Sequence, residues 1–324
     1  MSLIVQKFGG SSVANAGKLL HISRIIKAAR SQGHAVIVVV SAQGNTTDVL
    51  LQRAGSISPH PSGRELDALL SAGEQMAASL TAMCLHTQGV SAVSLAAWQL
   101  PIHSDSAHKD ARITGIGRER VERELSQERV VVVAGFQGLD AQGDLTTLGR
   151  GGSDYTAVAL AAAFHADRCL IYTDVDGVYT ADPRLCPSAR RLERISYEDM
   201  YALSRAGAQV LHDKCVALAQ ESGVEPEVRA CTEDAAGTLV CSASGSGRVT
   251  GVTRRLCEDG ALAAVTLVGA AVPSLDLQKP AILALSNAGI DVQGVDAGER
   301  TLTLYVEPDR SQAALCAVHD AFLT

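Results

Sequence analysis

The sequence has few aromatic residues and no block of basic residues. Phe, Trp and Tyr together make up 3% of the chain, and the formal net charge is −7. Proteins that bind single-stranded nucleic acids rely on stacked aromatic side chains and basic grooves, so nucleic acid is excluded as the main partner. A site for an anionic ligand must therefore be local, built from a few Lys and Arg side chains and backbone N–H groups.

Long apolar runs are also missing. Apolar stretches such as residues 35–40 and 130–136 are much shorter than the roughly 18 residues of a membrane-spanning helix. Lys7 and two glycines interrupt the N-terminal apolar run, so no signal peptide is expected. The eight cysteines include no CxxC pair, which is typical of reduced thiols in a cytosolic protein. We therefore predict a cytoplasmic protein with no membrane partner.

The length predicts about two domains. The chain has 324 residues, and domains average roughly 150 residues. With 47% hydrophobic and 19% charged residues, a disordered chain is excluded. Residues 242–248 are rich in Ser and Gly and predict a linker. We therefore predict one domain over 1–241 and a small α+β domain over 249–324.

Apolar runs alternate with helical patterns in the first domain. Strands are expected at residues 3–8, 35–40, 91–95, 130–136 and 169–173. Continuous β-branched strands separated by helices are typical of parallel sheets that are covered on both faces. The predicted fold class is α/β, an open and mostly parallel sheet sandwiched by helices.

A long helix is predicted over 62–86, and a second helix over 153–165. Ser62 and Glu65 have the spacing of a capping box. The residues expected to point inward from the first helix are Leu66, Leu69, Leu70, Met76 and Leu80.

The second domain is predicted to hold three strands and two helices. Strands are expected at 262–268, near Val292 and at 302–306, with helices at 275–288 and 311–322. A unit of this size is too short for a second catalytic domain.

Two turns near the N-terminus are candidates for ligand binding, because open α/β sheets bind ligands beyond the carboxyl ends of their strands. Lys7 lies near the end of the first strand, and Gly9 and Gly10 follow that strand. This turn favours phosphate binding, although two glycines can also meet a purely steric need. The second turn, residues 41–48, is either a ligand loop or a helix N-cap.

Two later turns carry charged residues. Residues 147–154 combine Arg150 with three glycines, then Ser and Asp at the start of an apolar helix, which favours anion binding. Residues 173–184 carry three carboxylates and an arginine in a register that does not fit a calcium loop. The sequence has no Walker loop, no GxGxxG and no protein-kinase HRD, so a nucleotide would be bound by other means.

Together the four turns resemble the aspartate kinases of the amino-acid kinase superfamily. The matching signatures, in family order and spacing, are KFGGSSVA at 7–14, SAQGNTTD at 41–48, SAGEQ at 71–75, VAGFQG at 133–138, TLGRGGSDYTAVALA at 147–161 and YTDVDGVYTADPR at 172–184. The resemblance covers residues 3–241. It implies the amino-acid kinase fold, followed by a single ACT-like regulatory or dimerisation domain.

The resemblance also implies a reaction. ATP, with Mg²⁺, would phosphorylate the β-carboxylate of L-aspartate to 4-phospho-L-aspartate, the first step towards lysine, threonine and methionine. The implied catalytic residues are Lys7, which neutralises charge on the transferred phosphoryl group, and Asp154, which holds the cationic groups in place. The resemblance further implies a homodimer or a higher homo-oligomer.

The remaining site residues follow from the same resemblance. The nucleotide is assigned to Gly9, Gly10, Ser11, Ser41, Thr173, Asp174, Tyr179, Asp182, Arg184 and Lys214. L-Aspartate is assigned to Thr47, Glu74, Arg150, Gly151, Gly152 and Ser153, with Glu74 on the ammonium and Arg150 on a carboxylate. From the sequence pattern without the resemblance, Glu74 would be a solvated helix residue. No residue is assigned as a metal ligand.

The chain departs from the family at two places. Gln209 stands where many members have a lysine that reaches the nucleotide phosphates, and Lys214 either supplies that charge or is a surface lysine. The tail lacks residues for one of the two usual ACT modules. One expectation is that feedback inhibition is absent or uses a rebuilt effector site. The alternative is that the single module serves only to dimerise. The sequence does not identify the amino-acid effector.

Two other functions remain as alternatives. One is a kinase of the same fold that acts on another small amino acid. The other is a weakly catalytic regulatory subunit, which Gln209 and the short tail would suit.

Overall fold

The computed structural model describes residues 2–231, 236–242, 249–272 and 275–323. The chain divides into two compact units: unit 1 holds residues 1–176 and 218–236, and unit 2 holds 177–217 and 237–324. Most of the expected linker, residues 243–248, lies outside the described residues, so the boundaries 1–241, 242–248 and 249–324 stay a prediction. Within the described ranges, no helix has both the length and the apolar character that crossing a membrane requires.

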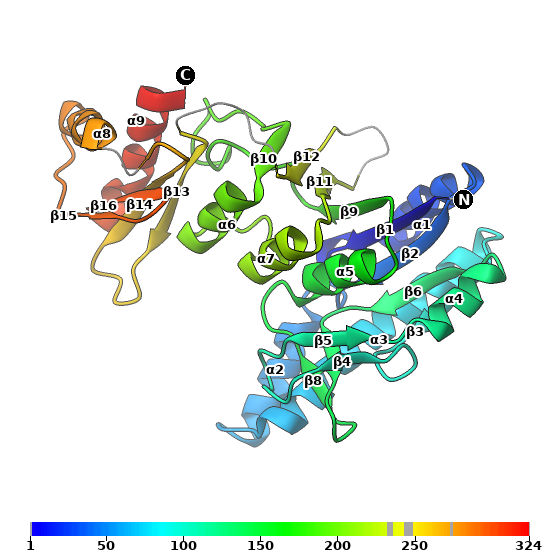
Figure 1. The fold of residues 1–324 in the computed structure, drawn as a ribbon. Helices are drawn as coiled ribbons and strands as arrows, with labels where there is room; N and C mark the ends of the chain where they lie inside the picture. The colour runs from blue at the N-terminus through cyan, green and yellow to red at the C-terminus, as the bar shows by residue number, and fades with distance from the viewer. Residues whose placement is uncertain (1, 232–235, 243–248, 273–274, 324) are drawn as a thin grey trace. The chain divides into compact units, whose positions relative to one another are not determined.

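Parallel strands form the centre of unit 1 (Figure 1). Their order is β11-β9-β1-β2-β6-β3, and all neighbouring pairs are parallel. The bounds are β1 Leu3–Phe8, β2 Ala35–Val40, β3 Ala92–Leu95, β6 Val130–Ala134, β9 Arg168–Thr173 and β11 Pro226–Ala230. The predicted parallel sheet is confirmed. Strand β6 ends before Phe136, because that residue adopts a φ of 69° and turns the chain.

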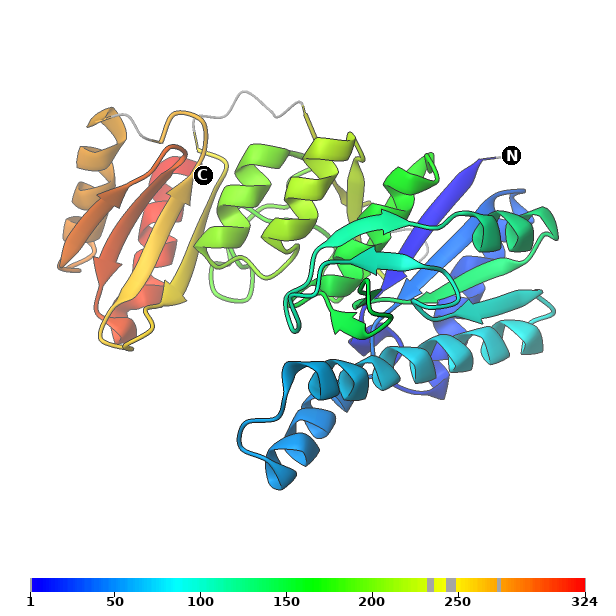
Figure 2. The same cartoon turned by 60° about the horizontal axis from the view of Figure 1, so that its bottom comes forward.

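Helices cover both faces of this sheet, as predicted. α1 (Ala16–Ser31) and α3 (Gly63–Thr87) pack on the face that includes Phe8, Val38 and Val132. α5 (Gly152–Ala163) packs against β1, β2 and β9 from the other face. α4 (Glu119–Ser126) lies beside β6, and α2 (Thr46–Ile57) packs on α3. Figure 2 shows α3 lying along the sheet.

The buried face of α3 differs from the predicted one. The cap is confirmed, because Ser62 Oγ accepts a hydrogen bond from the N–H of Glu65. Leu70 is buried as predicted, but Met76 is 50% exposed and Leu80 39% exposed. Ala77 and Ala78 are buried instead. Small side chains let the helix approach the sheet closely, so alanines face the core where Met76 and Leu80 were expected to do so.

A smaller sheet lies next to α3 in unit 1. Its order is β5-β4-β7-β8, formed by Ile113–Ile116, Ile102–Ser104, Gln137–Leu139 and Leu145–Thr147. β4 is antiparallel to β5 and parallel to β7, and β7 is antiparallel to β8. β8 leads directly into the Arg150 loop, so this sheet fixes where that loop begins.

Unit 2 contains a four-stranded antiparallel sheet. Its order is β13-β14-β16-β15, formed by Gly251–Leu256, Ala263–Val268, Thr301–Val306 and Gly294–Ala297. α8 (Leu275–Asn287) and α9 (Ser311–Leu323) share one apolar core with this sheet. The strand expected near Val292 begins two residues later, at Gly294.

Unit 2 also contains a pair of parallel strands and helices that follow them in the sequence. β10 (Arg194–Ser196) pairs with β12 (Thr238–Cys241). α6 (Tyr197–Ala206) lies against β13 and β14, and α7 (Asp213–Ser222) spans the point where the chain passes back into unit 1. Two short 3₁₀ turns, Gly10–Ser12 (η1) and Pro308–Arg310 (η2), complete the elements. The ACT-like identity of the C-terminal part stays a prediction.

Candidate active site

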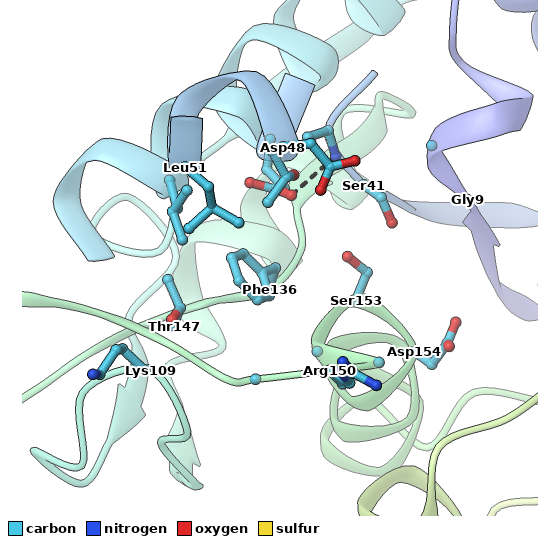
Figure 3. A pocket seen from close by; sticks show the side chains of 18 of the residues that line it. Gly9, Ser41, Asp48, Leu51, Lys109, Phe136, Thr147, Arg150, Ser153 and Asp154 are labelled. Carbon is cyan, nitrogen blue, oxygen red and sulfur yellow. Dashed lines mark hydrogen bonds between the residues drawn. The ribbon is translucent and has the colours of Figure 1, made fainter. Parts of the chain in front are cut away.

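A cavity of about 680 Å³ opens in unit 1 beyond the carboxyl ends of β1 and β2. The predicted site residues that line it are Lys7, Gly9, Gly10, Ser41, Thr47, Glu74, Arg150, Gly151, Gly152, Ser153 and Asp154. They come from segments far apart in the sequence, and this is the edge of the sheet where ligands of open α/β folds bind. Figure 3 shows Arg150, Ser153 and Asp154 near the start of α5, across the cavity from Ser41.

Lys7 and Asp154, which both line this cavity, form a buried ion pair. Lys7 lies between Val39 and Ile171 in the sheet, and α5 covers the face to which its side chain points. Its Nζ is 2.6 Å from Asp154 Oδ1, and each residue is 8% exposed. Asp154 lies in the first turn of α5, where the helix dipole stabilises a carboxylate. The pair holds a cation in place where an anionic ligand would enter.

The turns after β1 and β2 are held against each other. The N–H of Gly44 donates to the carbonyl of Gly10 at 3.0 Å. A Cβ added to Gly10 would lie 2.6 Å from the Ala42 carbonyl oxygen. A residue with a side chain could not approach this closely, so Gly10 meets a steric requirement and at the same time lines the cavity. A steric need for glycine and a role in ligand binding are therefore compatible in this turn.

Glu74 is a buried carboxyl group and not a solvated helix residue. It is 3% exposed and lies on the inner face of α3. Its Oε1 accepts the Ala42 N–H at 3.0 Å, and its buried Oε2 has no hydrogen-bond partner among the described residues. Burial raises the pKa of Glu74 to about 7. An unpaired carboxyl oxygen in a cavity is a ready partner for a ligand ammonium group.

The Arg150 loop depends on glycines. Gly149 has a φ of 78°, and Gly151, the N-cap of α5, a φ of 67°. A Cβ on Gly152 would lie 2.8 Å from the ring of Phe136. These glycines let the chain turn sharply into α5, so the N–H groups of its first turn face the cavity beside the exposed Arg150. The arrangement favours a ligand with carboxylate or phosphate groups.

Other residues that line the cavity were not assigned individually, although some lie in the candidate turns 41–48 and 147–154. They are Ala42, Gly44, Asp48, Leu51, Leu66, Leu70, Lys109, Phe136, Thr147 and Gly149. Most lie within or beside the matching signatures and could have been found by extending them. Lys109 could not, because it lies far from every signature in the sequence.

A buried carboxylate places Lys109 and Thr147. Asp67 on α3 is fully buried. It accepts hydrogen bonds from Thr147 Oγ1 at 2.7 Å, from the Lys109 N–H at 2.9 Å and from His108 Nδ1 at 2.9 Å. Lys109 has a φ of 70°, a conformation that non-glycine residues rarely adopt. Asp67 therefore joins α3, the 105–110 loop and β8 at one edge of the cavity.

The other predicted nucleotide residues do not line this cavity. Ser11 is exposed on η1, and Thr173 Oγ1 donates to Asp174 Oδ1 at 3.0 Å in unit 1. In unit 2, Arg184 Nη2 is 2.8 Å from Asp182 Oδ2, and this arginine lowers the pKa of Asp182. Tyr179 bridges to Arg191, and the Lys214 N–H bonds Asp213. The nucleotide roles of all these residues stay predictions.

Comparisons with known proteins agree with this architecture. A model of the amino acid kinase family matches residues 2–229. The chain is 49% identical to the aspartokinase of Bacillus sp. strain MGA3 over 240 residues, which cover 74% of this chain and 58% of that protein. It is 50% identical to the aspartokinase of Geobacillus stearothermophilus over 240 residues, covering 74% and 59%. The matched region thus spans less than two thirds of these relatives.

The fold has a counterpart among solved structures. The crystal structure of E. coli aspartokinase III in complex with aspartate and ADP superimposes with a TM-score of 0.82. The match covers 99% of this chain and 100% of that chain, at 21% sequence identity. The predicted α/β fold class is confirmed.

Proposed function

Because this chain belongs to the amino acid kinase family, we propose that it transfers the γ-phosphoryl group of ATP to the β-carboxylate of L-aspartate. The products are 4-phospho-L-aspartate and ADP. About half of the aligned residues are identical to those of the Bacillus and Geobacillus aspartokinases. The single observation that carries the proposal is that Lys7, Glu74 and Arg150 line one cavity.

The charges of these three residues match the two ends of an α-amino acid and a phosphoryl group. Glu74 lines the cavity, and its Oε2, which has no hydrogen-bond partner among the described residues, would take the substrate ammonium. Arg150 would pair with the α-carboxylate through its planar guanidinium group. With both ends held, the β-carboxylate is directed towards Lys7. The repulsion between two anions is then offset by Lys7 and the N–H groups at the start of α5.

The reaction needs no general base. A β-carboxylate is ionised near neutral pH, so its oxygen is already a nucleophile. As the bond from that oxygen to the γ-phosphorus forms, the bond from phosphorus to the β,γ-bridging oxygen breaks, and ADP leaves with the electron pair. The described residues that line the cavity include no histidine. Positioning and charge neutralisation therefore account for the proposed catalysis.

Mg²⁺ fits as a partner of ATP more than as a resident ion. The carboxylates that line the cavity are Asp48, Glu74 and Asp154. Asp154 is paired with Lys7, and Glu74 accepts the Ala42 N–H. When bound to the phosphates, Mg²⁺ supplies neutralisation of their negative charge. The protein's own contribution is Lys7, held in place by Asp154.

Trapping the product with hydroxylamine tests this proposal. An acyl phosphate gives a hydroxamate, so L-aspartate with ATP should yield aspartyl hydroxamate at a rate that scales with enzyme concentration. N-Acetyl-L-aspartate lacks the ammonium that Glu74 would bind and should be a poor acceptor. A faster reaction with another small amino acid would support the alternative kinase, and binding of both substrates without turnover would support a regulatory subunit.

The resemblance also supports a homo-oligomer, and we propose that the active form has at least two copies of the chain. Light scattering on the purified protein tests this, because a mass of one chain at assay concentration would contradict it. Whether an amino acid inhibits the enzyme is tested by measuring the proposed reaction in the presence of lysine and of threonine. Strong inhibition below about 1 mM would show that one module still carries an effector site.

A further inference from the structure

A cluster of soft and polar ligand atoms lies in unit 2, outside the cavity described above. Cys186 follows the turn at residues 182–185, and His319 and Asp320 lie on α9. One potential ligand atom from each of these three residues lies within 4.8 Å of the others. Cys186 and His319 are fully buried, whereas the Asp320 side chain is 53% exposed. The cluster is therefore open to solvent on one side only.

The geometry points to a binding site for a divalent transition-metal ion of the Zn²⁺ type, held by Cys186 Sγ, His319 Nδ1 and an Asp320 carboxylate oxygen. A thiolate, an imidazole and a carboxylate are all ligands that Zn²⁺ accepts. Ca²⁺ and Mg²⁺ prefer oxygen ligands alone, so the set discriminates against them. The exposed side of the cluster leaves the fourth position to water.

A hydroxyl group marks where the ion would lie. Ser188 Oγ is 3.3 Å from Cys186 Sγ and 3.2 Å from His319 Nδ1, and it donates a hydrogen bond to Asp320 Oδ1. One oxygen atom thus contacts all three proposed ligands, so the three converge on a common point. Zn²⁺ bonds are about 2.0–2.3 Å long. Binding therefore requires the Ser188 hydroxyl to move out and the ligands to close in by about 1 Å.

The ring of His319 is already oriented for ligation through Nδ1. Its Nε2 lies 2.8 Å from Thr180 Oγ1, which also accepts the Arg190 N–H at 2.9 Å. Nδ1 lies 3.2 Å from both Ser188 Oγ and Asp320 Oδ1. Ligation through Nδ1 places the ring proton on Nε2, where Thr180 Oγ1 is its acceptor. Histidines that bind metals are commonly fixed in this way by a partner at the second ring nitrogen.

The protonation balance of binding is simple. Ser188 Oγ donates a hydrogen bond to Asp320 Oδ1, so this carboxyl oxygen already acts as an acceptor before a metal binds. Cys186 binds as a thiolate, so its S–H bond breaks and one proton passes to the solvent as the metal–sulfur bond forms. No oxidant or reductant takes part.

The site would connect two functional parts of unit 2. Asp182 and Arg184, predicted to bind the nucleotide, lie just before Cys186 in the same turn. A metal bound to Cys186 on one side and to α9 on the other would restrain this turn. The C-terminal helix and the turn would then be coupled by metal occupancy, independently of whether the proposed reaction takes place.

Co²⁺ titration of the full chain tests the inference. The experiment uses protein without nucleotide, in a phosphine reductant that keeps the cysteines as thiols. We expect one Co²⁺ per chain, with the charge-transfer absorption of a cobalt–thiolate bond, and displacement of Co²⁺ by Zn²⁺. Cys186→Ser should remove the charge-transfer band, and Asp320→Asn should weaken binding by at least about 100-fold, since even outer-shell changes cost 10–100-fold.

Two further variants separate a metal site from a purely structural network. Ser188→Ala removes the competing hydroxyl, so binding should be at least as tight as in the unaltered chain. Cys257→Ser changes a half-buried thiol outside the cluster and should leave binding unchanged. Asp320 is exposed, so Asp320→Asn should fold, as circular dichroism would show. The absence of stoichiometric binding, or binding that Asp320→Asn and Cys186→Ser leave intact, overturns the inference.

Discussion

The Nζ atom of Lys7 lies 2.6 Å from Oδ1 of Asp154, and this pair links the central strand β1 to the first turn of α5. Both residues are nearly buried, so neither charge is compensated by bulk water. The position of the cation in the cavity is therefore set by two secondary-structure elements, and not by a flexible side chain alone.

Replacement of Lys7 should abolish most of the activity. In Lys7→Ala we expect kcat to fall by at least about 100-fold, in keeping with the loss of a transition-state contact worth roughly 3 kcal/mol. Hydroxamate formation measures this. Lys27→Ala is the matched control, because Lys27 Nζ bonds the Gln88 carbonyl at the surface, away from the cavity. Near-normal turnover of Lys7→Ala would show that Lys7 does not neutralise charge on the transferred phosphoryl group.

The same pair should show strong coupling in stability. Lys7→Ala and Asp154→Ala each leave one buried charge without its partner, so each should lower the free energy of unfolding by about 3–5 kcal/mol. The double variant leaves no unpaired charge and should lose much less than the sum of the two. Urea denaturation of the four proteins measures the coupling. Additive losses would show that the pair contributes little.

Glu74 should give aspartate binding a pH dependence near neutrality. Burial raises its pKa from the ordinary value of 4.5 to about 7, so the carboxyl is largely protonated in acid and cannot hold an ammonium. The KM for aspartate should therefore rise as the pH falls from about 8 to about 6. Glu74→Gln should give a high KM that changes little over this range. An equally steep profile in the variant would assign the titration to another group.

Stability should change with pH in the opposite direction to aspartate binding. A carboxyl with a raised folded-state pKa binds more protons in the folded than in the unfolded protein, so the free energy of unfolding falls as the pH rises from 4.5 through about 7. Glu74→Gln keeps the acceptor for the Ala42 N–H and removes this penalty. We expect it to melt at a slightly higher temperature than the unaltered chain at about pH 8, and at a similar one at about pH 5. Calorimetry at both pH values would reveal a contrary order.

Asp67 should act on the cavity through the residues that it holds. Asp67→Asn replaces one acceptor oxygen by a donor that faces Lys109 and Thr147. We expect a loss of about 1.5–3 kcal/mol in unfolding free energy and a higher KM for aspartate. Asp144→Asn is the control, because Asp144 pairs with Arg64 outside the cavity. An unchanged KM in Asp67→Asn would confine Asp67 to a structural role.

Gly151 should tolerate no side chain. Its φ of 67° costs an L-residue roughly 1–2 kcal/mol, and the strain falls on the N-cap of α5, so Gly151→Ala should lose both stability and activity. Gly55→Ala is the control, because Gly55 lies inside α2 with no atom within 4 Å of an added Cβ. That change should be neutral or stabilise by roughly 0.5–1 kcal/mol. Equal effects of the two changes would contradict the backbone argument.

Local patterns in the sequence were sufficient for the sheet but not for every helix face. Continuous apolar runs such as residues 35–40 correctly predicted buried parallel strands. On α3, however, side-chain size misled the prediction, since Met76 is exposed and Ala77 is buried. Which face of a helix approaches a sheet depends on the space between them, and that distance is a property of the tertiary structure.

The cavity was predictable only where its residues lie in the signatures. Arg150 and Lys7 belong to glycine-rich turns that point to anions. The Lys109 N–H donates a hydrogen bond to the Asp67 carboxylate, although the two residues are 42 positions apart in the sequence. Neither residue belongs to a recognisable motif. A contact that joins a helix, a loop and a strand leaves no local pattern, so only coordinates could reveal it.

The two turns at the top of the sheet are also continuous with α3. The Ala42 N–H donates to Glu74 Oε1. Two residues further along the same turn, the Gly44 N–H donates to the carbonyl of Gly10. This hydrogen-bonded relay runs from the proposed ammonium partner to the glycines beside Lys7. We therefore expect the two reactants to bind with synergy, each preparing the place of its counterpart.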